Sequence, residues 1–127
     1  MAELEGRTAL VTGASRGIGR AIARALARRG ATLALAARGE DGLRDTARLC
    51  LDDGAAAAEV HPVDLSDGAA IDTLCETLLA AHGAIDVLVN DAGTGVAGHA
   101  LEGDPTAWER ALMLNTAAPM RLTRRLA

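Results

Sequence analysis

Apolar residues in this chain form short continuous runs, separated by longer stretches in which they recur every three or four positions. The runs are typical of strands buried on both faces, and the stretches are typical of amphipathic helices. In residues 18–29, isoleucine and leucine side chains share one face, and Arg20, Arg24 and Arg28 repeat on the opposite face. We interpret these three arginines as a solvated helix face rather than as an anion site. The strands are predicted at residues 8–12, 31–37, 55–63 and 85–89.

Residues that begin and end helices divide this pattern into repeated units. A glycine follows each of the first three predicted helices, and Ser66 and Asp104 are candidate N-caps for the third and fourth. Four strand-then-helix units imply a parallel sheet with right-handed crossovers, which is a Rossmann-type, doubly wound α/β fold. The helices are predicted at residues 18–29, 40–53, 67–82 and from 105 onward.

The fourth predicted helix is still in progress at Ala127, where no glycine or other stop signal follows. We therefore expect residues 1–127 to be one incomplete domain of about four strands and four helices.

Residues 11–19, Val-Thr-Gly-Ala-Ser-Arg-Gly-Ile-Gly, connect the first strand to the first helix. Gly13 permits a sharp turn, Gly17 leaves the main chain open to a close approach, and Gly19 permits tight packing of helix on strand. The helix that follows directs unpaired N–H groups and the positive end of its dipole at an anion. A glycine triplet alone is equally typical of a structural turn, but between a strand and a helix it predicts a dinucleotide phosphate site.

The second predicted strand ends at Ala37 and Arg38, with no acidic residue at this point. In dinucleotide-binding folds a carboxylate here bonds the 2′-hydroxyl of NAD, whereas an arginine accommodates the 2′-phosphate of NADP. Arg16, in the glycine turn, offers a second positive charge. Charge therefore predicts NADP(H) in preference to NAD(H).

Composition argues against several other classes of protein. A formal net charge of −4 and a single aromatic residue, Trp108, do not suit nucleic-acid binding. No apolar run is long enough to span a membrane, and the acidic N-terminus has no apolar signal core, so we expect a cytoplasmic protein. Cys50 and Cys75 fall on apolar helix faces without further ligands at metal-binding spacing. We interpret them as buried reduced thiols and predict no metal site.

Four motifs, taken in order, resemble those of the short-chain dehydrogenases/reductases. Residues 12–19 resemble the family's TGxxxGIG turn, and residues 90–93, Asn-Asp-Ala-Gly, resemble its NNAG motif. Asp64 with Leu65 is similar to its adenine-contacting site, and Asn115 to the asparagine of its catalytic tetrad. The resemblance covers the whole chain but only the N-terminal half of the family's usual domain. It implies cofactor-binding roles for Thr12, Gly13, Ser15, Arg16, Gly17, Ile18, Gly19, Arg38, Asp64, Leu65, Asn90, Ala92 and Gly93.

The resemblance also implies an activity, hydride transfer between NADP(H) and a carbonyl or alcohol carbon of a small-molecule substrate, usually in a homo-oligomer. By this likeness Asp64 accepts a hydrogen bond from the adenine amino group, and the Asn115 carbonyl holds a water of the proton relay. Pro119 lies four residues after Asn115 and has no N–H to bond that carbonyl. We therefore predict a kink or a broken i-to-i−4 bond in the helix.

The chain also departs from the family pattern. Asp91 replaces the second asparagine of NNAG and places a carboxylate near an anionic cofactor. The sequence contains no tyrosine and no lysine, so the family's Tyr-x-x-x-Lys pair is absent from it. We do not assign acid–base catalysis to His61, which lies at the end of the third strand on the adenine side, or to His99, which lies in a glycine-rich loop with no carboxylate fixed beside it.

Three functional interpretations remain open from the sequence. The first is the cofactor-binding half of an NADP(H)-dependent oxidoreductase, inactive by itself. The second is a non-catalytic NADP-binding module or regulatory partner, and the third is a split enzyme completed by another chain. The substrate is not predicted, because in this family its pocket is built mainly from the second half of the domain.

Overall fold

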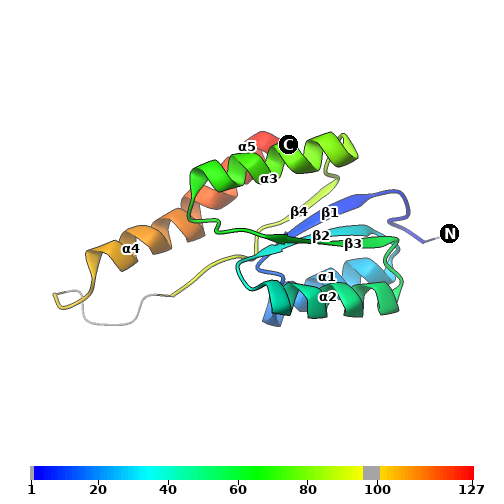
Figure 1. Cartoon of the computed structure of the whole chain (residues 1–127), viewed down its shortest axis with the longest axis horizontal. Coiled ribbons are helices and arrows are strands. Elements are labelled where there is room, and N and C mark those ends of the chain that lie inside the picture. The colour runs from blue at the N-terminus through cyan, green and yellow to red at the C-terminus, as the bar shows by residue number, and fades with distance from the viewer. Residues whose placement is uncertain (1, 96–100) are drawn as a thin grey trace.

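A parallel sheet lies between two layers of helices in the computed structural model, which describes residues 2–95 and 101–127 (Figure 1). Helices α1 and α2 cover one face of the sheet, α3 and α5 cover the other, and α4 extends away from one end. The strand order is β3-β2-β1-β4, which confirms the predicted α/β fold. The strands are β1 (Thr8–Thr12), β2 (Thr32–Ala37), β3 (Ala57–Pro62) and β4 (Val87–Val89), and the helices are α1 (Gly17–Arg28), α2 (Glu40–Asp53), α3 (Gly68–His82), α4 (Pro105–Leu112), the π-helical turn η1 (Met113–Ala117) and α5 (Ala118–Leu126).

The parallel pairing brings the carboxyl ends of the strands to one edge of the sheet. Strand β1 is central, with Thr12 opposite Ala36 of β2 and Val11 opposite Val89 of β4. The chain adds β2 and β3 on one side of β1 and then β4 on the other, so the strand order reverses beside β1. In open α/β sheets a reversal of this kind leaves a crevice at the carboxyl ends, where ligands bind.

Alternate side chains of β1 and β2 pack into two separate cores. Val11 and Leu35 belong to the core that includes Leu43 of α2, whereas Leu10 and Ala36 belong to the core beneath α3 and α5. Burial on both faces explains why these two strands are continuous apolar runs in the sequence. The sheet edge at which the crevice opens is therefore supported from above and below.

Both cysteines lie in these cores as free thiols, which confirms that they are buried. Burial raises the pKa of the Cys50 thiol to about 11 and also raises the pKa of Cys75. Within residues 2–95 and 101–127, no cluster of three or more His, Cys, Asp or Glu side chains has metal-ligand geometry. None of the helices described there is long and apolar enough to cross a membrane.

Two arginines of α1 contact α2, so the interpretation of their row as a solvated face is wrong for them. Arg20 donates from Nε to Oγ1 of Thr46 at 2.8 Å, and Arg24 donates to both carboxylate oxygens of Asp53 at 2.7 and 3.2 Å. Helix α2 packs beside α1, so the long arginine stems cross the helix–helix interface instead of entering solvent. Arg28, with 57% of its side chain exposed, fits the prediction.

The start of α3 also differs from the prediction. Asp67, not Ser66, is the N-cap, and its carboxylate accepts hydrogen bonds from the amides of Ala69 and Ala70. The Ser66 hydroxyl instead donates to Asp64 at 2.6 Å, which makes it unavailable as a cap. Strands β3 and β4 are shorter than predicted, and in the described part of the chain β4 pairs only with β1.

The helix that contains Asn115 is not a uniform α-helix. Between α4 and α5, the Ala118 N–H bonds the carbonyl of Met113, five residues earlier, in the π-helical turn η1. Pro119 follows immediately, at the start of α5. The predicted break in the i-to-i−4 pattern is therefore confirmed. Its cause is the missing proline N–H together with one extra residue in the turn.

Candidate functional site

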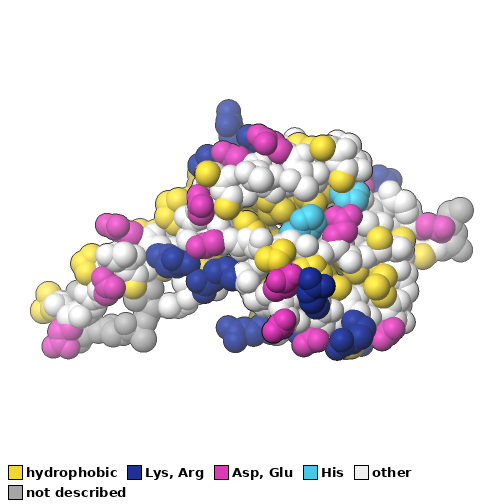
Figure 2. All heavy atoms as spheres, in the orientation of Figure 1, with side chains coloured by type: hydrophobic (Ala, Val, Ile, Leu, Met, Phe, Trp, Pro, Cys, Tyr) yellow, Lys and Arg dark blue, Asp and Glu magenta, His cyan; other side chains and the backbone are white. Residues whose placement is uncertain are grey.

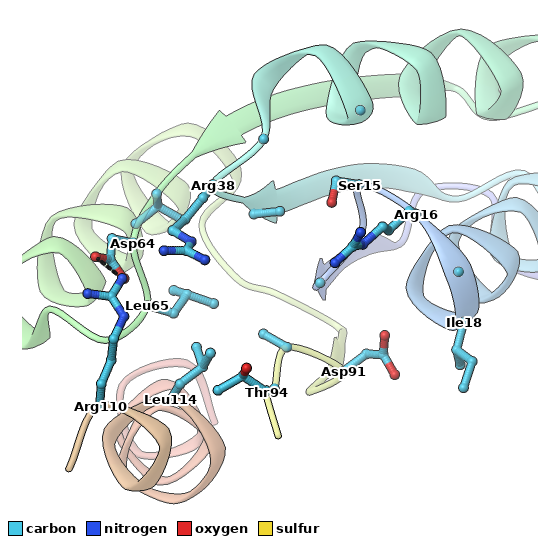
Figure 3. A pocket seen from close by; sticks show the side chains of 18 residues that line it. Ser15, Arg16, Ile18, Arg38, Asp64, Leu65, Asp91, Thr94, Arg110 and Leu114 are labelled. Atoms are coloured by element: carbon cyan, nitrogen blue, oxygen red, sulfur yellow. Dashed lines mark hydrogen bonds and ion pairs between the residues drawn. The ribbon is translucent and has the colours of Figure 1, made fainter. Parts of the chain in front are cut away.

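A pocket of about 670 Å³ opens at the carboxyl ends of the strands (Figure 3). The glycine turn after β1 and the end of β2 form one side of the pocket. The connection from β3 to α3, the segment after β4 (residues 90–95), and the helix α4 with η1 form the rest. Basic side chains gather on the surface where α4 extends from the rest of the molecule (Figure 2). The predicted cofactor-binding residues that line the pocket are Gly13, Ser15, Arg16, Gly17, Ile18, Arg38, Asp64, Leu65, Ala92 and Gly93.

The glycine turn is tightly packed at its two ends and open in the middle. Gly13 has a φ of +65°, and a Cβ there would lie 2.9 Å from the Ala92 nitrogen. A Cβ on Gly19 would lie 2.7 Å from the carbonyl carbon of Gly13. Gly17 has a φ of +57°, and no atom of residues 2–95 or 101–127 lies within 4 Å of its Cβ position. The turn thus has a fixed shape and leaves free space above Gly17, where a ligand can approach the main chain.

The N-terminus of α1 faces this open space without an acidic partner of its own. Arg16 is the N-cap residue, it makes no side-chain capping bond, and the first turn of α1 contains no acid. The main-chain N–H groups at this end are therefore available to an external anion.

Arg16 and Arg38 bring two exposed positive charges to the same pocket from different elements. Figure 3 shows both guanidinium groups directed into the cavity, one from the glycine turn and one from the end of β2. Neither forms an ion pair or a side-chain hydrogen bond with any residue in the described ranges. Two unpaired cations beside a free helix N-terminus form a site that attracts multiply charged anions.

The opposite wall contains a charge pair, Asp64 and Arg110, whose partners are bonded to each other. Oδ1 of Asp64 accepts hydrogen bonds from the Ser66 N–H at 3.0 Å and the Ser66 hydroxyl at 2.6 Å. Oδ2 of Asp64 accepts a hydrogen bond from Nη2 of Arg110 at 3.0 Å. The Ser66 hydrogen bonds, reinforced by the Arg110 charge, hold the pKa of the Asp64 carboxyl below its usual range. Asp64 is therefore an ionised acceptor at neutral pH.

Thr12 and Gly19, two residues with predicted cofactor roles, support the pocket from outside instead of lining it. The Thr12 hydroxyl is buried and accepts hydrogen bonds from the amides of Asp91 at 3.1 Å and Ala92 at 3.0 Å. Gly19 packs against the backbone of Gly13. Both residues hold the glycine turn and the segment after β4 together.

Asn90 and Asn115 also lie outside the lining. Asn90 is exposed, and its cofactor-binding role stays a prediction. Asn115 accepts a hydrogen bond from the Thr94 N–H at 2.8 Å through Oδ1 and donates from Nδ2 to the Thr94 carbonyl at 2.7 Å. This two-way pairing fastens η1 to the segment after β4 at the pocket margin, since Thr94 itself lines the pocket. The catalytic role of Asn115 stays a prediction.

Asp91 lines the pocket, and its carboxylate is directed toward the first turn of α1 (Figure 3). Its Oδ2 lies 2.9 Å from the position that a Cβ on Gly19 would take. The carboxylate thus lies beside the helix N-terminus at which the phosphate site is predicted.

His61, one of the two histidines considered for catalysis, does not line the pocket. Nε2 of His61 lies 3.0 Å from Glu59 on the edge strand β3. Figure 2 shows histidine side chains in cyan beside an acidic side chain, away from α4. His99 lies outside the described residues. Trp108 is 37% exposed on α4, close to Gly103, and lies outside the pocket lining.

Sequence reasoning missed Arg110, Leu114 and Thr94, all of which line the pocket. A local signal existed for Leu114, which is next to Asn115 in the sequence. No local signal links Arg110 to Asp64, which lies 46 residues earlier in the chain.

Comparison with known proteins identifies the family that the sequence motifs resemble. The model of the short-chain dehydrogenase family matches residues 7–127. The chain belongs to this family of oxidoreductases, and among its relatives are structures with NADP bound. It is 39% identical to a fatty acyl-CoA reductase of Mycobacterium tuberculosis over 128 residues, which cover 98% of this chain and 43% of that protein.

Solved structures extend the comparison. A metagenomic short-chain oxidoreductase in complex with NADP is 44% identical, with a TM-score of 0.92 over 97% of this chain and 56% of that one. L-sorbose reductase of Gluconobacter frateurii, complexed with NADPH and L-sorbose, is 34% identical, with a TM-score of 0.90 over 97% of this chain and 47% of that one. The chain spans about half the length of the relatives that it matches.

Proposed function

We propose that this chain binds NADP(H) and forms the cofactor-binding part of an oxidoreductase that acts on a carbonyl or alcohol carbon. The observation that carries the proposal is the pair of unpaired guanidinium groups, Arg16 and Arg38, directed into one pocket. No carboxylate stands at the end of β2 to bond a ribose 2′-hydroxyl, as NAD would require. The NADP and NADPH bound to two structural relatives are consistent with this choice.

The residues present fit each charged part of such a dinucleotide. The free N-terminus of α1 and the open space above Gly17 suit the diphosphate, and the two arginines suit the 2′-phosphate. Asp64 suits the amino group of the base. When bound, the nicotinamide supplies hydride transfer to or from the substrate carbon. This chain's residues bind and orient the cofactor, and Asn115 holds Thr94 at the margin of the pocket.

We propose further that the 127 residues bind the cofactor without turnover. The tyrosine and lysine that the family uses to move the substrate proton are not among them. A carbonyl or alcohol small molecule is the expected substrate class of the whole enzyme, and a homo-oligomer its expected assembly. The chain's predicted place is the cytoplasm, and no nucleic-acid partner is expected.

The test is a calorimetric titration of the purified chain with NADPH and with NADH. We expect Arg38→Ala to weaken NADPH binding about ten-fold or more, since an arginine–phosphate contact is worth about 1.5–3 kcal/mol. NADH binding should be almost unchanged. Arg44→Ala is the matched control, because Arg44 is an exposed arginine of α2 paired with Glu40. Equal loss of both cofactors would contradict the proposal.

The second candidate, a non-catalytic NADP-binding module, is favoured by the same missing tyrosine and lysine. An NADPH-oxidation assay with a panel of aldehydes and ketones tests the claim of inactivity, since turnover by the purified chain would disprove it. The cofactor titration and this assay are independent, so binding without turnover supports the proposal as stated.

A further inference from the structure

Arg110 lines the pocket, although neither the charge pattern nor the family motifs indicated it. It projects from α4 across the pocket margin, and its guanidinium meets Asp64 on the connection from β3 to α3 (Figure 3). The side chains of Arg110 and Asp64 are 48% and 41% exposed, so the pair lies at the rim of the cavity. Helix α4 therefore reaches the base end of the proposed cofactor site through a single side chain.

The hydrogen bonds to Asp64 leave it one free acceptor position. A carboxylate has about four lone-pair positions, two on each oxygen. The Ser66 N–H and hydroxyl occupy both positions on Oδ1, and Arg110 occupies one on Oδ2. The remaining position on Oδ2 accepts a hydrogen bond and cannot donate one, because the carboxyl is ionised. Its direction is set by the Arg110 bond, without which the second oxygen has no fixed partner.

We propose that Arg110 is a positioning residue that aims the free acceptor of Asp64 at the amino group of a purine base. The inference rests on the proposed cofactor function and adds base selection to it. A base with a keto group at that place offers no donor and presents an oxygen to the carboxylate, so the site selects adenine over hypoxanthine. Helix α4 thereby takes part in base selection without contacting the phosphates.

The test compares NADPH with its deaminated analogue, reduced nicotinamide hypoxanthine dinucleotide phosphate, by calorimetry on the 127-residue chain. We expect the wild-type chain to bind NADPH about ten-fold more tightly than the analogue, the value of a hydrogen bond to a charged acceptor. Arg110→Ala should weaken NADPH several-fold, leave the analogue almost unchanged, and so reduce the ratio to about one or two. Arg110→Lys should restore part of the ratio.

The control is Arg121→Ala. Arg121 has the same side-chain exposure of 48% and a comparable bond to a carboxylate, that of Asp72 on α3, but lies outside the pocket. Its loss should leave the ratio of the two affinities at the wild-type value. Thermal unfolding of each variant shows whether the fold is intact, and Arg110→Gln replaces the alanine variant if that one unfolds.

The possible results separate this inference from the proposed function. If Arg110→Ala weakens both cofactors equally, the residue only anchors α4 and the inference is wrong. If the wild-type chain binds both cofactors equally, Asp64 does not select the base, and the inference is wrong while the cofactor function stands. If the wild-type chain binds neither cofactor, the proposed function fails and the inference with it.

Discussion

The two walls of the pocket are built in opposite ways. We call the glycine turn with Arg16 and Arg38 the phosphate wall, and the group formed by Asp64, Arg110 and Leu114 the base wall. In the phosphate wall the backbone is locked by buried contacts, and the charged groups are unpaired. In the base wall the charged groups are paired with each other, and the contacts that hold them are partly exposed.

This difference shows where binding free energy is available to a ligand. Unpaired cations on a rigid backbone give up no internal partner when an anion arrives, so the phosphate wall can supply affinity. Paired charges are already partly satisfied and contribute mainly direction, so the base wall can supply selectivity. We test this difference with three substitutions, of which the first lies in the interior of the phosphate wall.

The largest effect is expected for Gly19→Ala. The new methyl group would meet the backbone of Gly13, which has no flexible side chain to move aside. We expect the free energy of unfolding to fall by about 3 kcal/mol, as in overpacked cores, and NADPH binding to be lost. Urea denaturation and calorimetry measure the two effects. Gly95→Ala is the control, since no atom of the described residues lies within 4 Å of its Cβ position, and a similar loss there would refute the explanation.

An intermediate effect is expected for Thr46→Val. The buried Thr46 hydroxyl lies 2.7 Å from the Ala14 carbonyl, to which it donates, and accepts the Arg20 bond, so it ties the glycine turn to α2. Valine has the same shape but leaves both partners unsatisfied, which costs about 2 kcal/mol. Chemical denaturation should show this loss, together with weaker NADPH binding. Thr73→Val, at an exposed threonine of α3, should change stability by less than about 0.5 kcal/mol.

The smallest effect, and the one of opposite sign, is expected for Asp91→Asn. The carboxylate lies beside the N-terminus of α1 and repels the diphosphate that is proposed to bind there. A repulsion of about 1 kcal/mol corresponds to a gain of about five-fold in NADPH affinity on substitution. The gain should shrink as salt is added. Asp52→Asn, an exposed site on α2, gives the same change of net charge away from the pocket and should leave the affinity unaltered.

The sequence alone was enough to predict features that depend only on residues close together in the chain. The glycine spacing and the acid-free end of β2 could be read because a strand, a turn and a helix follow one another directly. Arg110 and Thr46 could not be identified, because their roles depend on Asp64 and Ala14, which are 46 and 32 residues away. These contacts exist only after the sheet is assembled.

Competition between neighbours explains the remaining errors. Ser66 and Asp67 are both good N-caps, and the choice was decided by Asp64, which binds the Ser66 hydroxyl. Arg20 and Arg24 face away from the sheet core, as a solvated row would, but α2 lies on that side. A helical pattern shows which side chains avoid the core and does not show which second helix they meet.

The π-helical turn η1 has a consequence for how the last helix can vary. One additional residue in a turn rotates everything after it by about 100° relative to a regular helix. Asn115 can therefore face Thr94 while Ala118, Leu122 and Leu126 pack into the core with α3. A helix of constant pitch would have to compromise between these two orientations. Because the inserted residue sets the orientation of α5 separately from that of α4, substitutions at the pocket margin need not disturb the packing of α5 against α3.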